Sequence, residues 1–253
     1  MLQLTAKKNK QMMNIKKNQA IELIQQDIEK MSELILGQLR ELDNIFSSGE
    51  LDIDKDQLKE FRNNENEIND YEVKISNEFI NIVILYKPVA SELRKIITCY
   101  RLSINLERIG DIAHKILRLL SEIKQEQPLT DYLDEMSNML IMTNNMVEKS
   151  ILSFFNNDIE YAIWTLKNDD VIDKINRKMI KKLLKKKKLD ANDPQTINNL
   201  INIKTIISNI ERIADHSTNI AEASIYYLKG QDVRHTNISD IETGLGETSG
   251  QNE

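Results

Sequence analysis

Two acidic pairs with nearly identical surroundings recur in this chain. Glu107 and Asp111 lie in the segment ERIGD, and Glu211 and Asp215 lie in the segment ERIAD. Residues four apart share one face of a helix, so each pair would place two carboxylates about one turn from each other. Like charges at this spacing destabilise a bare helix by roughly 0.2–0.5 kcal/mol, so a compensating partner is expected. A bound cation is one such partner.

A shift of 104 positions superposes the two acidic pairs and finds a second polar pair ahead of each. If the helices that carry these pairs pack as antiparallel neighbours, four oxygen-bearing groups converge in each half. Such groups suit hard or borderline cations, and iron, zinc, manganese and magnesium are the candidates. The candidate ligands are Glu65, Asn69, Glu107 and Asp111 in the first half, and Asp169, Asp173, Glu211 and Asp215 in the second half.

These acidic pairs could also have a simpler role than metal binding. An acidic pair on a helix is commonly solvated surface, and Lys115 could neutralise Asp111 by a simple ion pair. The equivalent of Lys115 in the second half is Asn219. His114 could join the first site or be a hydrogen-bonded surface histidine. We therefore predict that the second half holds the stronger metal site and that the first is weak or empty.

The elements that carry these residues are predicted to be helices. The chain has only 7 Gly and 3 Pro among 253 residues, and apolar side chains recur every three or four positions. We predict an all-α fold of two tandem, pseudo-repeated three-helix bundles. The expected helices are 17–46, 56–86, 88–121, 129–155, 158–187 and 194–228. The expected domains are an N-terminal extension (1–18), the first bundle (19–125), the second bundle (126–232) and a disordered acidic tail (233–253).

Composition argues against several classes of protein. The single cysteine, Cys99, excludes an internal disulfide and a cysteine-cluster zinc site and is typical of a reducing compartment. No signal peptide and no membrane-spanning stretch is expected. The net charge of −6 argues against nucleic-acid binding. The basic run 177–188 is either a solvated helix end or a docking surface for an acidic partner or lipid headgroups.

Catalytic motifs are absent from the sequence. There is no Gly-rich phosphate loop, no Gly-x-Ser-x-Gly and no His-Glu-x-x-His. The paired Glu-x-x-His of ferritin-like carboxylate bundles is also missing. We therefore predict that the chain is not an enzyme and has no catalytic residues.

Four segments resemble the PhoU family. ERIGDIAHKI (107–116) and NIERIADHSTNIAE (209–222) are similar to its two signature helices, KPVASELR (87–94) to its turn into the third helix, and YYLKGQDVRH (226–235) to the end of its fold. The resemblance covers about residues 21–235. It implies two tandem three-helix bundles that usually dimerise, with metal clusters on the eight candidate ligands. Asn69 and Lys115 depart from the family pattern and weaken the first cluster.

The resemblance also implies a function. PhoU proteins are negative regulators of phosphate uptake and of the phosphate-starvation response, and they link the ATPase subunit of a phosphate ABC transporter to a sensor histidine kinase. It thus implies a cytoplasmic homodimer, peripheral to the inner face of the membrane through its partners. Two alternative functions remain: a metal-storage or metal-dependent carboxylate-bundle enzyme, and a domain associated with a sodium-phosphate cotransporter.

Overall fold

Six α-helices and one 3₁₀ turn make up nearly all of the secondary structure in the part of the chain that the structure describes. That part comprises residues 2–49, 52–123, 129–185, 193–234, 236 and 240–241 of this computed structural model. The elements are α1 (Leu2–Ser48), α2 (Lys55–Tyr86), α3 (Ala90–Ser121), the 3₁₀ turn η1 (Thr130–Tyr132), α5 (Leu133–Phe155), α6 (Ile159–Leu184) and α7 (Pro194–Lys229).

Aspartate side chains begin three of the helices. Asp54 accepts hydrogen bonds of 2.8 Å from the backbone N–H groups of Asp56 and Gln57 at the start of α2. Asp158 accepts one from the N–H of Glu160 at the start of α6. Asp193 caps α7 in the same way and precedes a proline at the first helical position. These caps satisfy backbone donors that a helix leaves unpaired at its N-terminus.

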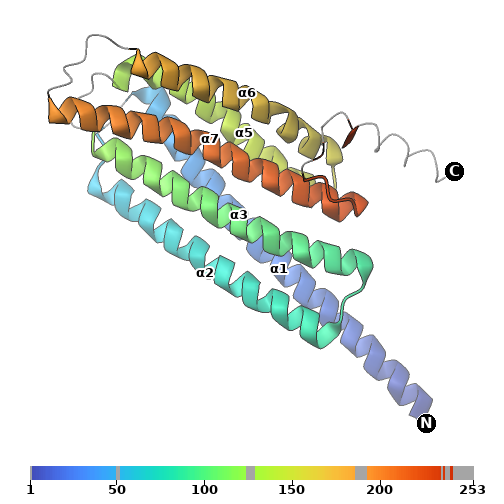
Figure 1. The fold of residues 1–253 in the computed structure, drawn as a ribbon. Coiled ribbons are helices and arrows are strands. Elements are labelled where there is room, and N and C mark those ends of the chain that lie inside the picture. Colours follow the sequence, from blue (N-terminus) through green and yellow to red (C-terminus); the bar gives the residue numbers. More distant parts are fainter. Residues whose placement is uncertain are drawn as a thin grey trace.

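The helices form two three-helix bundles that lie against each other (Figure 1). Helices α1, α2 and α3 pack together as the first bundle, and α5, α6 and α7 pack together as the second. The bundles meet where α3 packs on α7 and where α1 packs on α5. One continuous core of buried residues runs through both, so the halves are joined by apolar packing as well as by the chain.

Helices α3 and α7 run antiparallel across this junction. Thr98 Oγ1 donates to the backbone carbonyl of Ala223, and Asn105 and His216 are in contact farther along. Moving forward on α3 therefore corresponds to moving backward on α7. By this register, Arg108 comes opposite the turn that contains Arg212 and Ile213.

The fold class is confirmed, while three details differ from the sequence-based expectation. Helix α1 begins at Leu2 and not near Lys17, since residues 2–16 are mostly good helix formers that lack the apolar stripe used to predict a boundary. The fourth predicted helix opens with the turn η1 before α5. Helix α3 begins at Ala90, after the Lys87–Pro88 stop. Lys186–Lys188 and most of the predicted tail lie outside the described residues.

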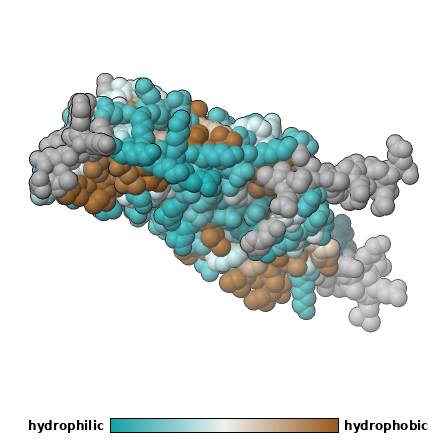
Figure 2. Space-filling view, turned by 45° about the horizontal axis from the view of Figure 1, so that its top comes forward, coloured by the Kyte–Doolittle hydropathy of each residue, from teal (hydrophilic) through white to brown (hydrophobic). Residues whose placement is uncertain are grey.

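The surface is largely hydrophilic, with separate hydrophobic patches on the face shown in Figure 2. No described helix is long and apolar enough to cross a membrane. Near its C-terminal end, α2 and the residues that follow carry a group of exposed apolar side chains. They are Val73, Ile80, Ile84, Leu85 and Val89, which we call the α2 apolar row.

Candidate metal centres

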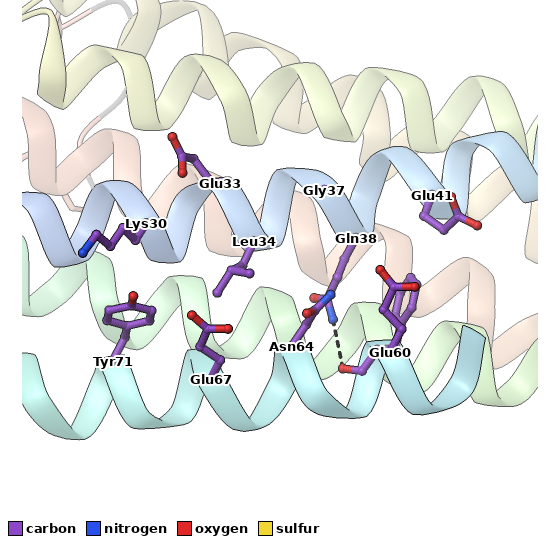
Figure 3. A pocket seen from close by; sticks show the side chains of 11 residues that line it. Lys30, Glu33, Leu34, Gly37, Gln38, Glu41, Glu60, Asn64, Glu67 and Tyr71 are labelled. Atoms are coloured by element: carbon purple, nitrogen blue, oxygen red, sulfur yellow. Dashed lines mark hydrogen bonds between the residues drawn. The ribbon is translucent and has the colours of Figure 1, made fainter. Parts of the chain in front are cut away.

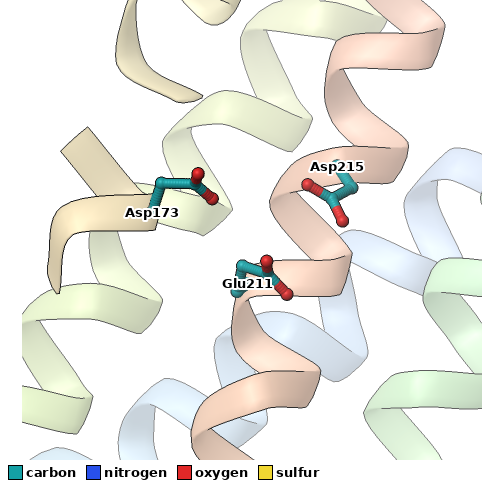
Figure 4. Close-up of side chains that lie close together, drawn as sticks. All are labelled: Asp173, Glu211 and Asp215. Atoms are coloured by element: carbon teal, nitrogen blue, oxygen red, sulfur yellow. The ribbon is translucent and has the colours of Figure 1, made fainter. Parts of the chain in front are cut away.

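Three of the predicted ligands come together in the second bundle. Asp173 on α6 and Glu211 and Asp215 on α7 each offer a carboxylate oxygen, and these oxygens lie within 4.8 Å of one another. Figure 4 shows the side chain of Asp173 on α6 directed toward those of Glu211 and Asp215 on α7. We call them the acidic cluster. Among the described residues they are the group of this kind whose spacing suits a shared ion.

Burial and mutual repulsion make this region costly to ionise. Burial, followed by the charge of Asp215, raises the pKa of Glu211. Burial, followed by the charge of Asp173, raises the pKa of Asp215. Two neighbouring carboxylates with raised pKa values favour either a proton or a cation between them.

Asp169, the fourth predicted ligand of this half, lies beside the acidic cluster without being part of it. Burial and then the charges of Asp215 and Asp173 raise its pKa to about 6. Its carboxylate, one turn before Asp173 on α6, is therefore subject to the negative charge of the acidic cluster. Asp173 also has a cationic neighbour, since Arg177 Nη2 lies 3.4 Å from its Oδ2 in an exposed ion pair. Exposed pairs of this kind contribute little, so Asp173 stays available.

In the first bundle, two of the predicted ligands, Glu65 and Glu107, lie against basic side chains. Glu65 is paired with Nδ1 of His114, which is only 15% exposed. Glu107 lies 3.3 Å from Nε of Arg108, and burial together with the charge of Asp111 raises its pKa. Asn69 offers only a neutral oxygen. The structure thus does not gather a set of three acidic ligands here among the residues that it describes.

The suspected pairing of Lys115 with Asp111 is not formed: within the described part of the chain, neither side chain has an ion-pair partner. His114 instead takes Glu65, which is one of the residues that the sequence predicts as a metal ligand. In the first half a candidate ligand is therefore paired with a histidine, and Lys115 takes no part in that pair.

Sequence reasoning missed one polar position in each half. Glu72 follows Asn69 by three residues, and its charge contributes to the raised pKa of Glu107. The 104-residue shift relates Glu72 to Asn176, which follows Asp173 by three residues. Buried Oδ1 atoms of Asn69 and Asn176 both lack a hydrogen-bond partner among the described residues. A buried acceptor without a donor is unfavourable, so a cation could satisfy either oxygen. Asn69 is already among the predicted ligands, whereas Asn176 is an additional candidate. The i, i+3 spacing from Asn69 and Asp173, combined with the repeat, could have identified Glu72 and Asn176 from the sequence.

Two other charged grooves lie away from these ligands. A cavity of about 580 Å³ between α1 and α2 carries four glutamates, and Figure 3 shows Gln38 Nε2 donating to the carbonyl of Phe61 within it. A cavity of about 500 Å³ on α6 is lined by six basic residues, from Lys174 to Lys185. Within it Lys182 pairs with Glu135 and lies over the ring of Tyr132. The described part of the basic run is therefore only partly a free solvated face.

Comparison with known proteins places these features in a family. The PhoU domain model matches the chain twice, at residues 28–120 and 135–224. The phosphate-specific transport system accessory protein PhoU homolog of Pseudomonas aeruginosa is 30% identical over 201 residues, which are 78% of this chain and 82% of that protein. The PhoU protein of Escherichia coli K12 is 28% identical over 227 residues, 89% of this chain and 90% of that protein.

A solved structure agrees with the sequence comparison. The crystal structure of PhoU from Pseudomonas aeruginosa superposes with a TM-score of 0.76 at 28% identity, covering 85% of this chain and 99% of that one. The two domain matches fall on the two bundles. The two sequence relatives are named as accessory proteins of a phosphate-specific transport system.

Proposed function

Because this chain belongs to the PhoU family, we propose that it is a negative regulator of phosphate uptake and of the phosphate-starvation response. It acts as an adaptor between the ATPase subunit of a phosphate ABC transporter and a sensor histidine kinase. Its place is the cytoplasm, where it reaches the inner face of the membrane through these partners. The observation that carries the proposal is the PhoU domain repeated over both bundles, together with relatives named as accessory proteins of a phosphate-specific transport system.

Co-purification from phosphate-replete cells tests the adaptor role. The tagged full chain is expected to recover a transporter ATPase subunit and a sensor kinase, and to recover less of both after phosphate starvation. Recovery of neither protein in replete cells would count against the adaptor. Recovery of the ATPase alone would remove the kinase from the proposal and keep the link to transport.

The proposal includes a metal ion at the acidic cluster. Its donors are all oxygens, which suits magnesium, manganese, iron or zinc. Three things support the fit: three carboxylate oxygens within 4.8 Å, raised pKa values at Glu211 and Asp215, and an unpartnered buried oxygen on Asn176. A cation there would neutralise the carboxylates and connect α6 to α7. In this proposal Asp169 is a ligand or a charged neighbour of the ion, and the first-half residues Glu65, Asn69, Glu107 and Asp111 form the weaker site.

Metal analysis of protein purified without chelator separates this role from a metal-storage or metal-dependent enzyme. Glu211→Ala/Asp215→Ala is expected to lose bound metal, while the matched variant Glu65→Ala/Asp111→Ala retains most of it. If the metal is regulatory, the first variant also recovers less of the transporter ATPase. Normal partner recovery without metal would make the ion dispensable for regulation, and many metal ions per chain would favour storage.

A homodimer is also part of the proposal. Exposed apolar groups are typical of surfaces that another protein covers, and the α2 apolar row has side chains that are 49–69% exposed. Sedimentation equilibrium of the full chain is expected to give a dimer, and Ile80→Glu/Ile84→Glu to give a monomer. A wild-type monomer at tens of micromolar would remove the dimer from the proposal.

A further inference from the structure

Two adjoining cavities between α2, α3 and α7 are lined mainly by cationic side chains. The first, of about 430 Å³, contains Arg62, Arg108, Lys115, Arg118 and Arg212. The second, of about 310 Å³, adds Lys55 and Lys59 and shares Arg62, His114 and Arg118 with the first. We call this continuous surface the basic groove. It is lined by none of the lysines of α6, and it adjoins the acidic cluster at Arg212, which follows Glu211 on α7.

Most of these cations are not committed to a carboxylate. Within the described part of the chain, Arg62, Lys115, Arg118 and Arg212 form no ion pair or side-chain hydrogen bond. The groove contains two carboxylates, and one of them, Glu65, is occupied by His114. Arg108 pairs with Glu107 outside the lining, so Asp111 alone remains to oppose the other four cations of the first cavity. The groove therefore has an excess of positive charge, although the chain as a whole has a net charge of −6.

The register of the two bundles contributes to this excess. Arg108 and Arg212 hold the same position in the two repeats, 104 residues apart. Because α3 and α7 run antiparallel, the two arginines meet at the junction and line one cavity. Both also lower the pKa of His216, after burial, which agrees with two positive charges close to that ring.

The second bundle has no counterpart of the groove. The 104-residue shift carries Lys55, Lys59 and Arg62 onto Ile159, Ile163 and Leu166. In the same way, Lys115 corresponds to Asn219, and Arg118 to Glu222. At these five positions the first half carries cations, and the second half carries apolar residues, a neutral amide and a carboxylate. A helix surface that merely needs solvation does not require this difference.

We infer that the basic groove binds an inorganic oligophosphate, that is, a chain of two or more phosphate groups. Arginine binds phosphate oxygens in a fork of paired hydrogen bonds, and lysine adds point charge. The cations extend over ten residues of α3, from Arg108 to Arg118, which is about 15 Å of helix and longer than one phosphate. The only apolar residues of the lining are Leu58 and Ile112, so it offers no Phe, Tyr or Trp to stack on a nucleotide base. Its one aromatic ring, that of His114, is paired with Glu65. This inference does not rest on the proposed function.

Titration calorimetry of the full chain tests it, with tripolyphosphate as the probe, a chelator present and the ionic strength fixed. The variant Arg62→Gln/Lys115→Gln/Arg118→Gln removes three exposed charges from the groove. Its matched control, Lys174→Gln/Lys178→Gln/Lys181→Gln, removes three from α6. We expect the first variant to weaken binding by about tenfold or more, the sum of roughly three exposed charge contacts, and the control by less than about twofold. Orthophosphate and sulfate should bind at least about tenfold more weakly than tripolyphosphate.

Four results would overturn the inference. Equal losses in both variants would mean a general electrostatic attraction, and no loss in the first would place binding elsewhere. ATP binding much more tightly than tripolyphosphate would make the groove a nucleotide site. A hexaglutamate peptide that binds more tightly than tripolyphosphate, and whose affinity falls in the groove variant, would identify an acidic protein segment as the ligand.

Discussion

His216 Nδ1 lies 3.0 Å from Oδ1 of Asn105, across the junction between the two bundles. The histidine is on α7 and the asparagine is on α3, 111 residues apart. Burial, assisted by the charges of Arg212 and Arg108, lowers the pKa of His216, so the folded protein favours its neutral form. The neutral ring with the proton on Nδ1 donates to Asn105, and this hydrogen bond joins the bundles together with the one from Thr98 to the carbonyl of Ala223.

A double-mutant cycle should measure this contact. At pH 7.5 we expect His216→Ala and Asn105→Ala to share a coupling energy of about 0.5–1.5 kcal/mol, the usual contribution of a buried neutral hydrogen bond. Urea unfolding of the wild type, the two single variants and the double variant gives the value. Strict additivity of the two substitutions would mean that the contact adds nothing to stability.

The two bundles should unfold as one unit because they share a core. Ile75 on α2 is fully buried in the first bundle, and Ile75→Ala should lower the free energy of unfolding by about 2–5 kcal/mol. Trp164, the only tryptophan, is on α6 in the second bundle and reports on that half. We expect its fluorescence and the far-ultraviolet circular dichroism to shift to the same lower urea midpoint. The exposed substitution Leu23→Ala on α1 is the control. A Trp164 transition unmoved by Ile75→Ala would show independent domains.

Asp169 should make the metal-free protein less stable as pH rises. Its pKa is raised from 3.8 to about 6 on folding, so between these values the folded state binds more protons than the unfolded state. Stability therefore falls as pH rises through that window, and the cost is fully present above it. Asp169→Asn should be more stable than the wild type by about 1 kcal/mol at pH 7 in chelator, discounted because the carboxyl is half exposed. The two should be nearly equal at about pH 3.5, below both pKa values. The exposed Glu148→Gln should show no such trend, and a pH-independent gap for Asp169→Asn would contradict the expectation.

Metal affinity should weaken in acid. Protons compete with the cation for Asp169, Glu211 and Asp215, whose pKa values are all raised. Lowering the pH from 7 to 5 should weaken Mn²⁺ or Zn²⁺ binding by about tenfold or more, since a group with a pKa of about 6 is mostly protonated at pH 5. Calorimetric titrations at the two pH values check this. An affinity that stays constant would exclude these carboxylates as ligands.

Much of the fold was predictable because its signals are local. Few glycines, apolar side chains at helical spacing and a proline at Pro88 place helix boundaries within a few residues, as at the end of α2. The start of α1 was not predicted, because residues 2–16 have a helix-forming composition but no apolar periodicity. Apolar periodicity is the signal that marks a helix packed against a core.

The site was only partly predictable, since pairing between helices is not local. The repeat alone placed Asp173, Glu211 and Asp215 together. It did not separate Asp169 from them, because that depends on the register of α6 against α7. The ion pair of His114 with Glu65 and the meeting of Arg108 with Arg212 also depend on how helices distant in sequence face each other.

The meeting of Arg108 with Arg212 has the geometry of a symmetric dimer. Two identical three-helix units packed through this helix would present one arginine twice at their two-fold axis, and any substitution would change both sides of the interface. Joining the units in one polypeptide, as duplication and fusion of a gene do, removes that constraint, because each copy is then encoded separately. One copy can then change a side chain that the other keeps while the shared junction is retained, as Lys115 and Asn219 show in this chain.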